Sequence, residues 1–284
     1  MDREIFQALY GMTGLAVYSG PAHNPLFFLL ATLSILLIER LVPADPLQPV
    51  FSVGFFQDCV WSALTMLFQG FVTVLYVQWL QQVYLARFGY LTHPSVYQWP
   101  EGLRLLLAIL LVDLAAWIQH WLKHKVPWLW QLHKIHHFLE LFILRSFSVV
   151  PLFILGVNTL QVGYFGVFMV WQTRFYHANI KWNMGWLRFI LVTPQSHRIH
   201  HSAEHRHQDK NLGVMFSFWD RMFGTHYKGC QEYPATGILD RGLPLEKESR
   251  PLSLLLVPVR QMFYSFVMMG RDIRALAARG RGGP

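Results

Sequence analysis

Apolar and polar positions fall into long apolar runs separated by shorter polar segments. The first three runs cover residues 25–42, 58–80 and 103–124. A helix rises about 1.5 Å per residue, so each run is long enough to cross about 30 Å of hydrocarbon, with some local thinning around the shortest. We therefore predict a membrane-spanning helix in each run.

A fourth apolar stretch, residues 142–176, is longer than one span needs and is interrupted around residues 156–158. We predict two short helices in a hairpin that dips into the membrane and returns. This arrangement places the polar segments on either side of the hairpin on the same face of the membrane. The last apolar run, 252–269, contains Pro258 and Arg260 and is expected to span the membrane or to lie in its interface.

The composition supports a membrane protein. The chain is 53% hydrophobic and 14% charged, with a mean hydropathy of +0.29, which is too apolar for an ordinary soluble domain. The first residues lack the basic and apolar regions of a cleaved signal peptide. We expect an all-α integral-membrane helix bundle that forms a single membrane domain over residues 1–284.

The formal net charge is +8, and the basic residues gather in the polar segments 120–140 and 177–230 and at the C-terminus. By the positive-inside rule, a histidine-rich helical cap formed by these segments faces the cytoplasm together with the C-terminus. Anionic lipid is the expected partner of this charge, and no nucleic-acid-binding motif accompanies it. Residues 279–284 are expected to be disordered.

Histidine occurs in two copies of the pattern His-x-x-His-His, which we call the histidine boxes. The boxes are His133, His136 and His137, and His197, His200 and His201. Positions i, i+3 and i+4 lie on one face of a helix, so each box is expected to present three imidazoles towards one point. Chance rarely produces two such boxes from 14 histidines in 284 residues.

Local signals favour a short helix for each box. Pro127 ends the third apolar helix, and a new helix can then carry the first box. Thr193 is a suitable N-cap for the second box, and Pro194 suits the first helical position. Three further histidines join the candidate metal ligands, namely His120 and His124, one turn apart at the water end of the third run, and His177 after the hairpin.

Nine imidazoles are too many for one ion and suit two ions with open positions. Nitrogen ligands suit Zn, Cu, Fe or Ni, and so many neutral ligands favour a metal that changes its redox state. A site at the membrane face of an apolar bundle meets aliphatic chains. Two irons can share the electrons that O2 reduction requires, so a non-haem diiron oxygenase is the favoured hypothesis.

Three other readings remain open. The segment from His201 to His205 fits the inverted zinc-peptidase motif His-x-x-Glu-His, with Glu204 as general base. That reading uses two histidines and leaves most of the others unexplained. Haem ligation would require histidines deeper within the spans. A histidine-rich metal transporter would require polar residues within several spans, where Asp58 and Asp113 are the candidates.

Several residues around the boxes have two possible roles. Asp113 shares a helix face with His120, so it either hydrogen-bonds a ligand ring or pairs with a basic side chain. Asp209 and Asn211 are expected to hold the loop after the second box, and could also hydrogen-bond a ligand. His205 and His207 are either hydrogen-bond partners of the ligands or solvated surface residues.

The histidine spacing resembles that of the fatty acid hydroxylase/sterol desaturase superfamily of membrane diiron enzymes. Further similarities are Leu129-Trp130, Asp113 ahead of His120, His201-Ser202, Asp209-x-Asn211 and the string from Trp219 to Thr225. The resemblance covers residues 105–228 and is greatest to the alkylglycerol monooxygenase and bacterial sterol-desaturase-like branch.

This resemblance implies two iron ions held by the nine histidines, with O2 as co-substrate. It implies hydroxylation or desaturation of a fatty acyl, sterol-like or alkyl-ether lipid. The chain has no cytochrome b5-like His-Pro-Gly-Gly segment. Electrons are therefore expected from a separate donor, such as a ferredoxin-like protein, a cytochrome b5-like protein or another reductase.

Overall fold

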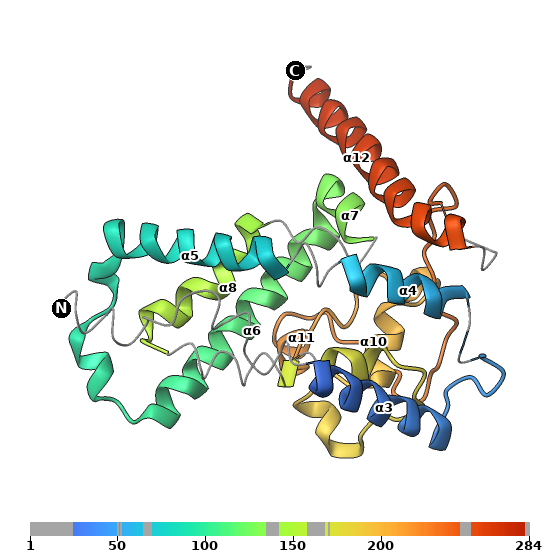
Figure 1. Ribbon diagram of the computed structural model, residues 1–284, viewed down its shortest axis with the longest axis horizontal. Coiled ribbons are helices and arrows are strands. Elements are labelled where there is room, and N and C mark those ends of the chain that lie inside the picture. The colour runs from blue at the N-terminus through green and yellow to red at the C-terminus, as the bar shows by residue number, and fades with distance from the viewer. Residues whose placement is uncertain are drawn as a thin grey trace.

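The computed structural model describes residues 25–49, 51, 53–64, 70–134, 142–157, 168–169, 171–244 and 251–281. This part of the chain is helical and contains no named strand (Figure 1). Its extended segments pair through isolated bridges, such as that between Leu191 and Phe216. The all-α prediction is confirmed for the described residues.

Among the described residues, two helices are long and apolar enough to cross a membrane, α6 (Glu101–Lys125) and α12 (Pro251–Arg281). They correspond to the third and last apolar runs of the sequence. The first run forms α3 (Pro25–Leu41). The second falls on α4 (Val53–Leu64) and α5 (Gly70–Arg87), and residues 65–69 between them lie outside the described part.

The expected interruption of the fourth apolar stretch is present. Helix α8 (Phe142–Ile154) packs against α5 and α6 and ends just before Gly156. Gly156 has a φ of +58°, and a Cβ atom at this position would lie 2.6 Å from the ring of Tyr97. Only glycine fits this turn. A helical segment then returns through residues 171–177, whereas residues 158–167 lie outside the described part.

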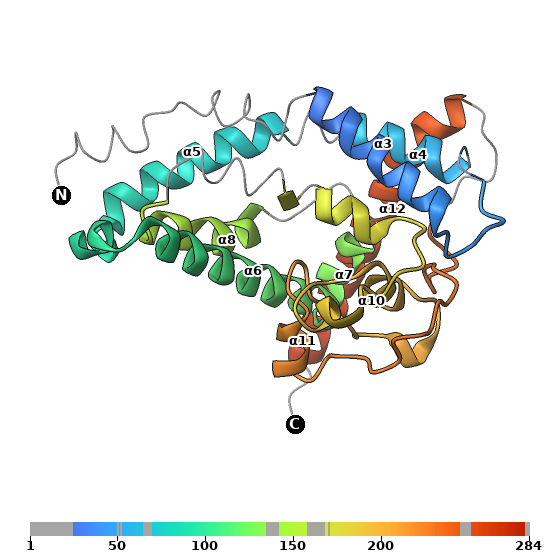
Figure 2. The same ribbon diagram turned by 90° about the horizontal axis from the view of Figure 1, so that it is seen from below.

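The cap consists of short helices around the C-terminal end of α6 (Figure 2). The α-helices of the cap are α7 (Pro127–His133), α10 (Pro194–His200) and α11 (Phe218–Met222), and the 3₁₀ helices are η5 (Gly185–Phe189) and η6 (His205–His207). Two more 3₁₀ helices, η3 (Gly89–Leu91) and η4 (Pro94–Gln98), precede α6. As predicted, α6 ends before Pro127, which begins α7.

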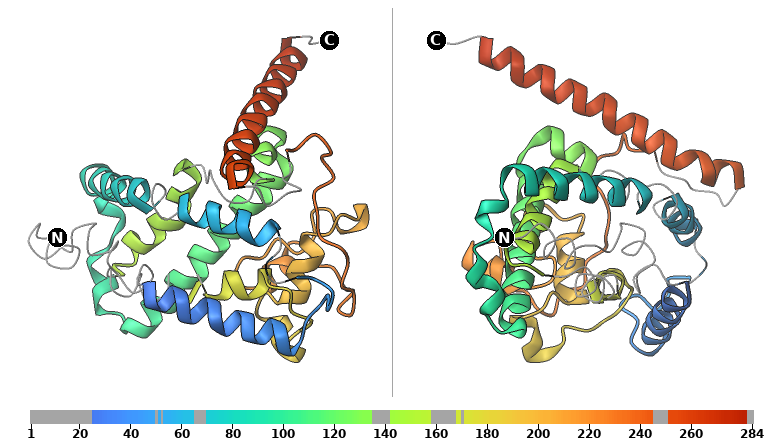
Figure 3. Two further views of the ribbon diagram at one scale, coloured as in Figure 1. Left: turned by 45° about the vertical axis from the view of Figure 1, so that its right-hand side comes forward. Right: turned by 60° about the vertical axis from the view of Figure 1, so that its left-hand side comes forward.

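Helix α12 packs against α7 and α4, and its C-terminal part extends away from the other helices (Figure 3). The ammonium group of Lys134, whose side chain is 1% exposed, lies 2.6 Å from a carboxylate oxygen of Asp240. The Tyr264 hydroxyl donates to the same carboxylate at 3.0 Å. These contacts tie α12 to the residue that follows His133. Helix α12 includes residues 279–281 of the tail that we expected to be disordered, and residues 282–284 lie outside the described part.

Candidate metal centre

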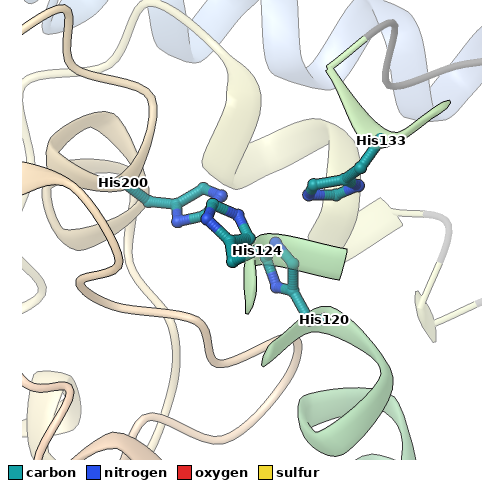
Figure 4. Close-up of side chains that lie close together, drawn as sticks. All are labelled: His120, His124, His133 and His200. Carbon is teal, nitrogen blue, oxygen red and sulfur yellow. The ribbon is translucent and has the colours of Figure 1, made fainter. Parts of the chain in front are cut away.

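Four histidines from three helices converge beside the C-terminal end of α6. We call them the first cluster: His120 and His124 of α6, His133 of α7 and His200 of α10. Each offers a ring nitrogen, and these nitrogens lie within 4.8 Å of one another. Figure 4 shows the four rings gathered around a common point. A group of imidazoles at this spacing has the dimensions of a metal site.

A second cluster lies beside the first and contains His177, His197 and His201. The Nε2 atom of His197 is 2.9 Å from Nε2 of His177 and also 2.9 Å from Nε2 of His201. The rings of His197 and His200 are 5.3 Å apart, so the two clusters are neighbours. His197 is buried, whereas His177 is exposed, and the second cluster is therefore open on one side.

The second histidine box does not point to a single place, and the expectation of one common point was wrong. His197 and His201 join the second cluster, whereas His200 joins the first. Consecutive residues of a helix differ by about 100° in direction, so His200 and His201 diverge, while residues four apart stay on one face. His136 and His137 of the first box lie outside the described residues.

One short loop, residues 209–212, holds three of the rings in the first cluster, and we call it the anchoring loop. The contacts are His120 Nδ1 to Leu212 O at 2.7 Å, His124 Nδ1 to Asp209 Oδ1 at 3.2 Å, and His200 Nδ1 to Lys210 O at 3.0 Å. A carbonyl oxygen only accepts hydrogen bonds, so the ring Nδ1 carries the hydrogen. The lone pair then resides on Nε2, which leaves that atom able to bind a metal.

Two residues with left-handed backbone conformations shape the anchoring loop. Asp209 has a φ of 57° and Asn211 a φ of 53°. The Asn211 side chain donates to the backbone oxygen of Ser196 at 3.0 Å and accepts from the backbone nitrogen of Tyr227 at 2.9 Å. Asn211 thus holds the loop, as predicted, and Asp209 contacts a ligand candidate directly. No sequence pattern pointed to the two backbone carbonyls that contact His120 and His200.

The electrostatics favour neutral imidazole rings in the first cluster. Burial, with a smaller effect of His124, lowers the pKa of His200 to about 3. Its ring is therefore neutral at physiological pH, which is the state that a metal ligand requires. Burial alone would raise the pKa of Asp209, but hydrogen bonding and the positive charge of Lys125 hold it below its usual value. A carboxylate therefore faces His124 Nδ1.

Two buried carboxylates, each in a residue 2% exposed, fasten the cap to α6. Asp113 accepts hydrogen bonds from the backbone nitrogens of Met215 and Phe216 and from Trp219 Nε1. Within the described part of the chain neither role expected for Asp113 is seen, because the cap segment that folds back over α6 hydrogen-bonds to both carboxylate oxygens. Asp220 accepts from four donors, which are Trp117 Nε1, Leu212 N, Gly213 N and Thr225 Oγ1.

The other charged and histidine residues after the second box lie apart from the clusters. Glu204 and His205 are exposed, and Glu204 accepts a hydrogen bond from Arg206 at 2.7 Å. His207 is neither a solvated residue nor grouped with the candidate ligands, because it is 1% exposed and packs against the Tyr227 ring at 4.6 Å. His207 is buried because residues 227–232 pack over it, and the spacing of residues in the sequence does not predict that contact.

With this geometry established, comparison with known proteins gives a consistent result. Residues 105–225 match the model of the fatty acid hydroxylase family. These residues are therefore similar to the fatty acid hydroxylase family. They contain every described histidine of both clusters, and the resemblance seen in the histidine spacing is confirmed. Together with α6 and α12, this match indicates a membrane protein.

The chain is also similar to several curated proteins. An ornithine lipid hydroxylase of Rhizobium tropici is 25% identical over 46% of this chain and 44% of the relative. A human cholesterol 25-hydroxylase is 29% identical over 43% of this chain and 50% of the relative. An alkylglycerol monooxygenase of Danio rerio is 29% identical over 45% of this chain and 31% of the relative.

The matched part of the chain therefore covers half or less of the length of these relatives. No solved structure matches the chain.

Proposed function

We propose that the chain is a membrane-bound non-haem diiron oxidoreductase that uses O2 to hydroxylate or desaturate a lipid. The observation that carries the proposal is the pair of adjoining histidine clusters in a fatty acid hydroxylase region. Seven described histidines form these clusters. The proposed ligand set adds His136 and His137, which lie outside the described residues, and is thus the nine histidines expected from the sequence.

The donor set fits iron. All the described candidates offer imidazole nitrogen, which suits iron and accommodates a change of oxidation state. The Nε2 atom of His124 is buried and has no hydrogen-bond partner among the described residues. Burying such an atom costs free energy unless a ligand satisfies it, and a metal ion in the first cluster would do so.

When bound, two irons would pass electrons from a separate donor to O2 and provide the oxidising power needed at an unactivated C–H bond. The chain's own residues hold and orient the ligands. The anchoring loop fixes the ring orientation of His120 and His200, and burial keeps His200 neutral. The exposed side of His177 gives the second cluster an opening towards a substrate.

The setting of the site supports a lipid substrate. Helix α6 supplies two candidate ligands and is also one of the two helices able to cross a membrane. The relatives are named for an ornithine lipid, cholesterol and alkylglycerol, so we propose a fatty acyl, sterol-like or alkyl-ether lipid. A separate reductase or ferredoxin-like or cytochrome b5-like protein would supply the electrons.

We also propose the organisation of the chain in the membrane. Residues 1–284 would form one membrane domain, with residues 105–228 as its histidine-box region. The cap and C-terminus would face the cytoplasm, because basic residues are concentrated there. The zinc-peptidase alternative is weakened because Glu204 and His205 are both exposed and lie outside the clusters.

Metal analysis and lipid profiling test the proposed function together. Purified protein reconstituted with iron should hold about two irons per chain, as expected for this number of nitrogen ligands. Cells with and without the gene should differ in a lipid by the mass of one oxygen or of two hydrogens. A single tightly bound zinc, or iron bound without any change in cellular lipids, would refute the proposal.

A further inference from the structure

The cap carries a group of exposed apolar side chains, which we call the cap patch. Its members come from η5 and α11 and the residues beside them, namely Trp186 (68% exposed), Phe189 (51%), Ile190 (42%), Met222 (66%) and Phe223 (50%). Scattered apolar residues on a surface need no explanation, but large side chains gathered in this way mark a contact with a membrane or another molecule.

The cap patch is continuous with the side of a candidate membrane span. The ring of Phe223 stacks on Trp117 of α6 with centroids 4.4 Å apart, and Trp219 Nε1 donates to Asp113 of α6 at 2.9 Å. Trp117 and Asp113 precede His120 by about one and two helical turns, so α11 lies about 5 to 10 Å deeper along α6 than the first cluster. Ile118 and Leu111 of α6 are exposed at the same level.

Basic side chains accompany the cap patch. The guanidinium groups of Arg188 and Arg221 lie over the ring of Phe189, at 4.6 and 4.9 Å from its centroid. Residues 185–191 and 221–228 contain no Asp or Glu. A cavity of about 230 Å³ opens beside the patch, and its lining includes Arg188, His226 and Lys228.

One carboxylate lines this cavity, that of Asp220, and it is already engaged by four hydrogen-bond donors within the protein. His226 is half-buried, and burial together with Arg221 lowers its pKa. The charge available to a ligand is therefore the positive charge of the arginines and Lys228. This surface pairs aromatic and aliphatic groups with arginine and lysine, as segments in the bilayer interface do.

We propose that the cap patch is embedded in the interfacial layer of the same bilayer that α6 crosses. Trp186, Met222 and Phe223 enter the boundary between headgroups and acyl chains. Arg188 and Lys228 bind the phosphate groups of anionic lipids at the mouth of the cavity. A soluble protein could also cover the cap patch. However, the patch is continuous with the side of α6 that we place in lipid, and a soluble partner would have to enter the bilayer to reach it.

Fluorescence quenching by lipids measures the depth of the cap patch. Met222→Cys would carry an environment-sensitive label in a Cys59→Ser, Cys230→Ser background, in nanodiscs of phosphatidylcholine with or without doxyl-labelled phosphatidylcholine. The matched control is Gln208→Cys, because Gln208 is exposed. Its neighbour Asp209 pairs with Lys125 at the C-terminal end of α6, away from the part of α6 that contacts α11. We expect at least about twofold quenching at position 222 and little at position 208. No quenching at position 222, or equal quenching at both positions, overturns the proposal.

Charge reversal tests the lipid phosphate contacts. In nanodiscs of phosphatidylcholine and phosphatidylglycerol, the wild-type protein should retain phosphatidylglycerol preferentially when examined by native mass spectrometry. The double variant Arg188→Glu, Lys228→Glu should lose this preference several-fold, whereas Arg241→Glu, a reversal of an exposed arginine that does not line the cavity, should keep it. Equal loss in both variants overturns the assignment, as does displacement of the lipid by inorganic phosphate, which would indicate a site for the free anion.

Discussion

The Nδ1 atom of His120 lies 2.7 Å from the backbone oxygen of Leu212, a residue 92 positions further along the chain. This contact joins the candidate membrane span α6 to the loop that follows the second histidine box. The same loop contacts His124 and His200, so one segment of four residues orients rings from two helices. The shape of this loop should therefore govern how well the first cluster binds a metal.

The backbone conformation of Asn211 can be tested separately from its side chain. Asn211→Gly removes the side-chain hydrogen bonds but tolerates a φ of 53°, whereas Asn211→Ala removes them and also disfavours that φ by about 1 kcal/mol. Iron content and turnover should fall in the order wild type, Gly, Ala. The electronic spectrum of the cobalt-substituted protein should show a change in coordination, which a general loss of stability would not produce. Identical behaviour of the two variants would show that the backbone conformation is irrelevant.

Loss of one ring from the first cluster should remove metal and activity together. We expect His200→Ala to abolish turnover and to reduce the iron content by about one ion per chain, because this partly buried ring is one of four at the site. His205→Ala is the matched control, since His205 is exposed and outside both clusters. Iron analysis and product formation in the same preparations measure both effects. Full activity of His200→Ala would refute the assignment of this ligand.

Glu204 distinguishes an oxygenase from a zinc peptidase. The side chain is exposed and hydrogen-bonded to Arg206, so Glu204→Gln should leave lipid turnover within about twofold of wild type. A peptidase that used Glu204 as its general base would lose nearly all activity on the same change. Assays of lipid oxidation and of peptide hydrolysis, run side by side, separate the two outcomes.

Asp220 should matter for stability rather than for metal binding alone. Asp220→Ala leaves buried donors without an acceptor, including Trp117 Nε1, so we expect the protein to be destabilised by about 3 kcal/mol or more. Trp117→Phe alone should lower the stability by about 1 kcal/mol. In the Asp220→Ala background the same substitution should cause almost no further loss, because the shared hydrogen bond is already absent. Thermal denaturation in detergent measures both effects. Simple additivity of the two substitutions would contradict the contact.

The sequence predicted the features that depend on neighbours within a few residues. The spacing of His120 and His124 places both rings on one helix face, and the structure has them in one cluster. Pro127 separates α6 from α7, and Thr193 caps α10 through a capping box with Ser196. The break near Gly156 was predicted for the same reason, since glycine there permits a backbone conformation that other residues disfavour.

Contacts between residues far apart in the sequence could not be predicted in this way. Lys134, which is buried, and Asp240, which is partly exposed, form an ion pair across 106 positions, and nothing in the local sequence of either residue indicates the other. The two carbonyl groups of the anchoring loop are equally invisible, because every residue has a backbone carbonyl. Asp113 was placed correctly on the face of His120, but its partners, 102 to 106 positions away, were not predicted.

The sequence by itself determined that helices form in the apolar runs and that histidines are concentrated around the end of α6, because helix periodicity and capping act over a few residues. Only the tertiary structure decided how the second box divides between two clusters and which atoms orient the rings. That division depends on where α10 lies relative to α6. This placement is held by the contacts of Asp113, Asp220 and the anchoring loop, which bring together residues about 100 positions apart.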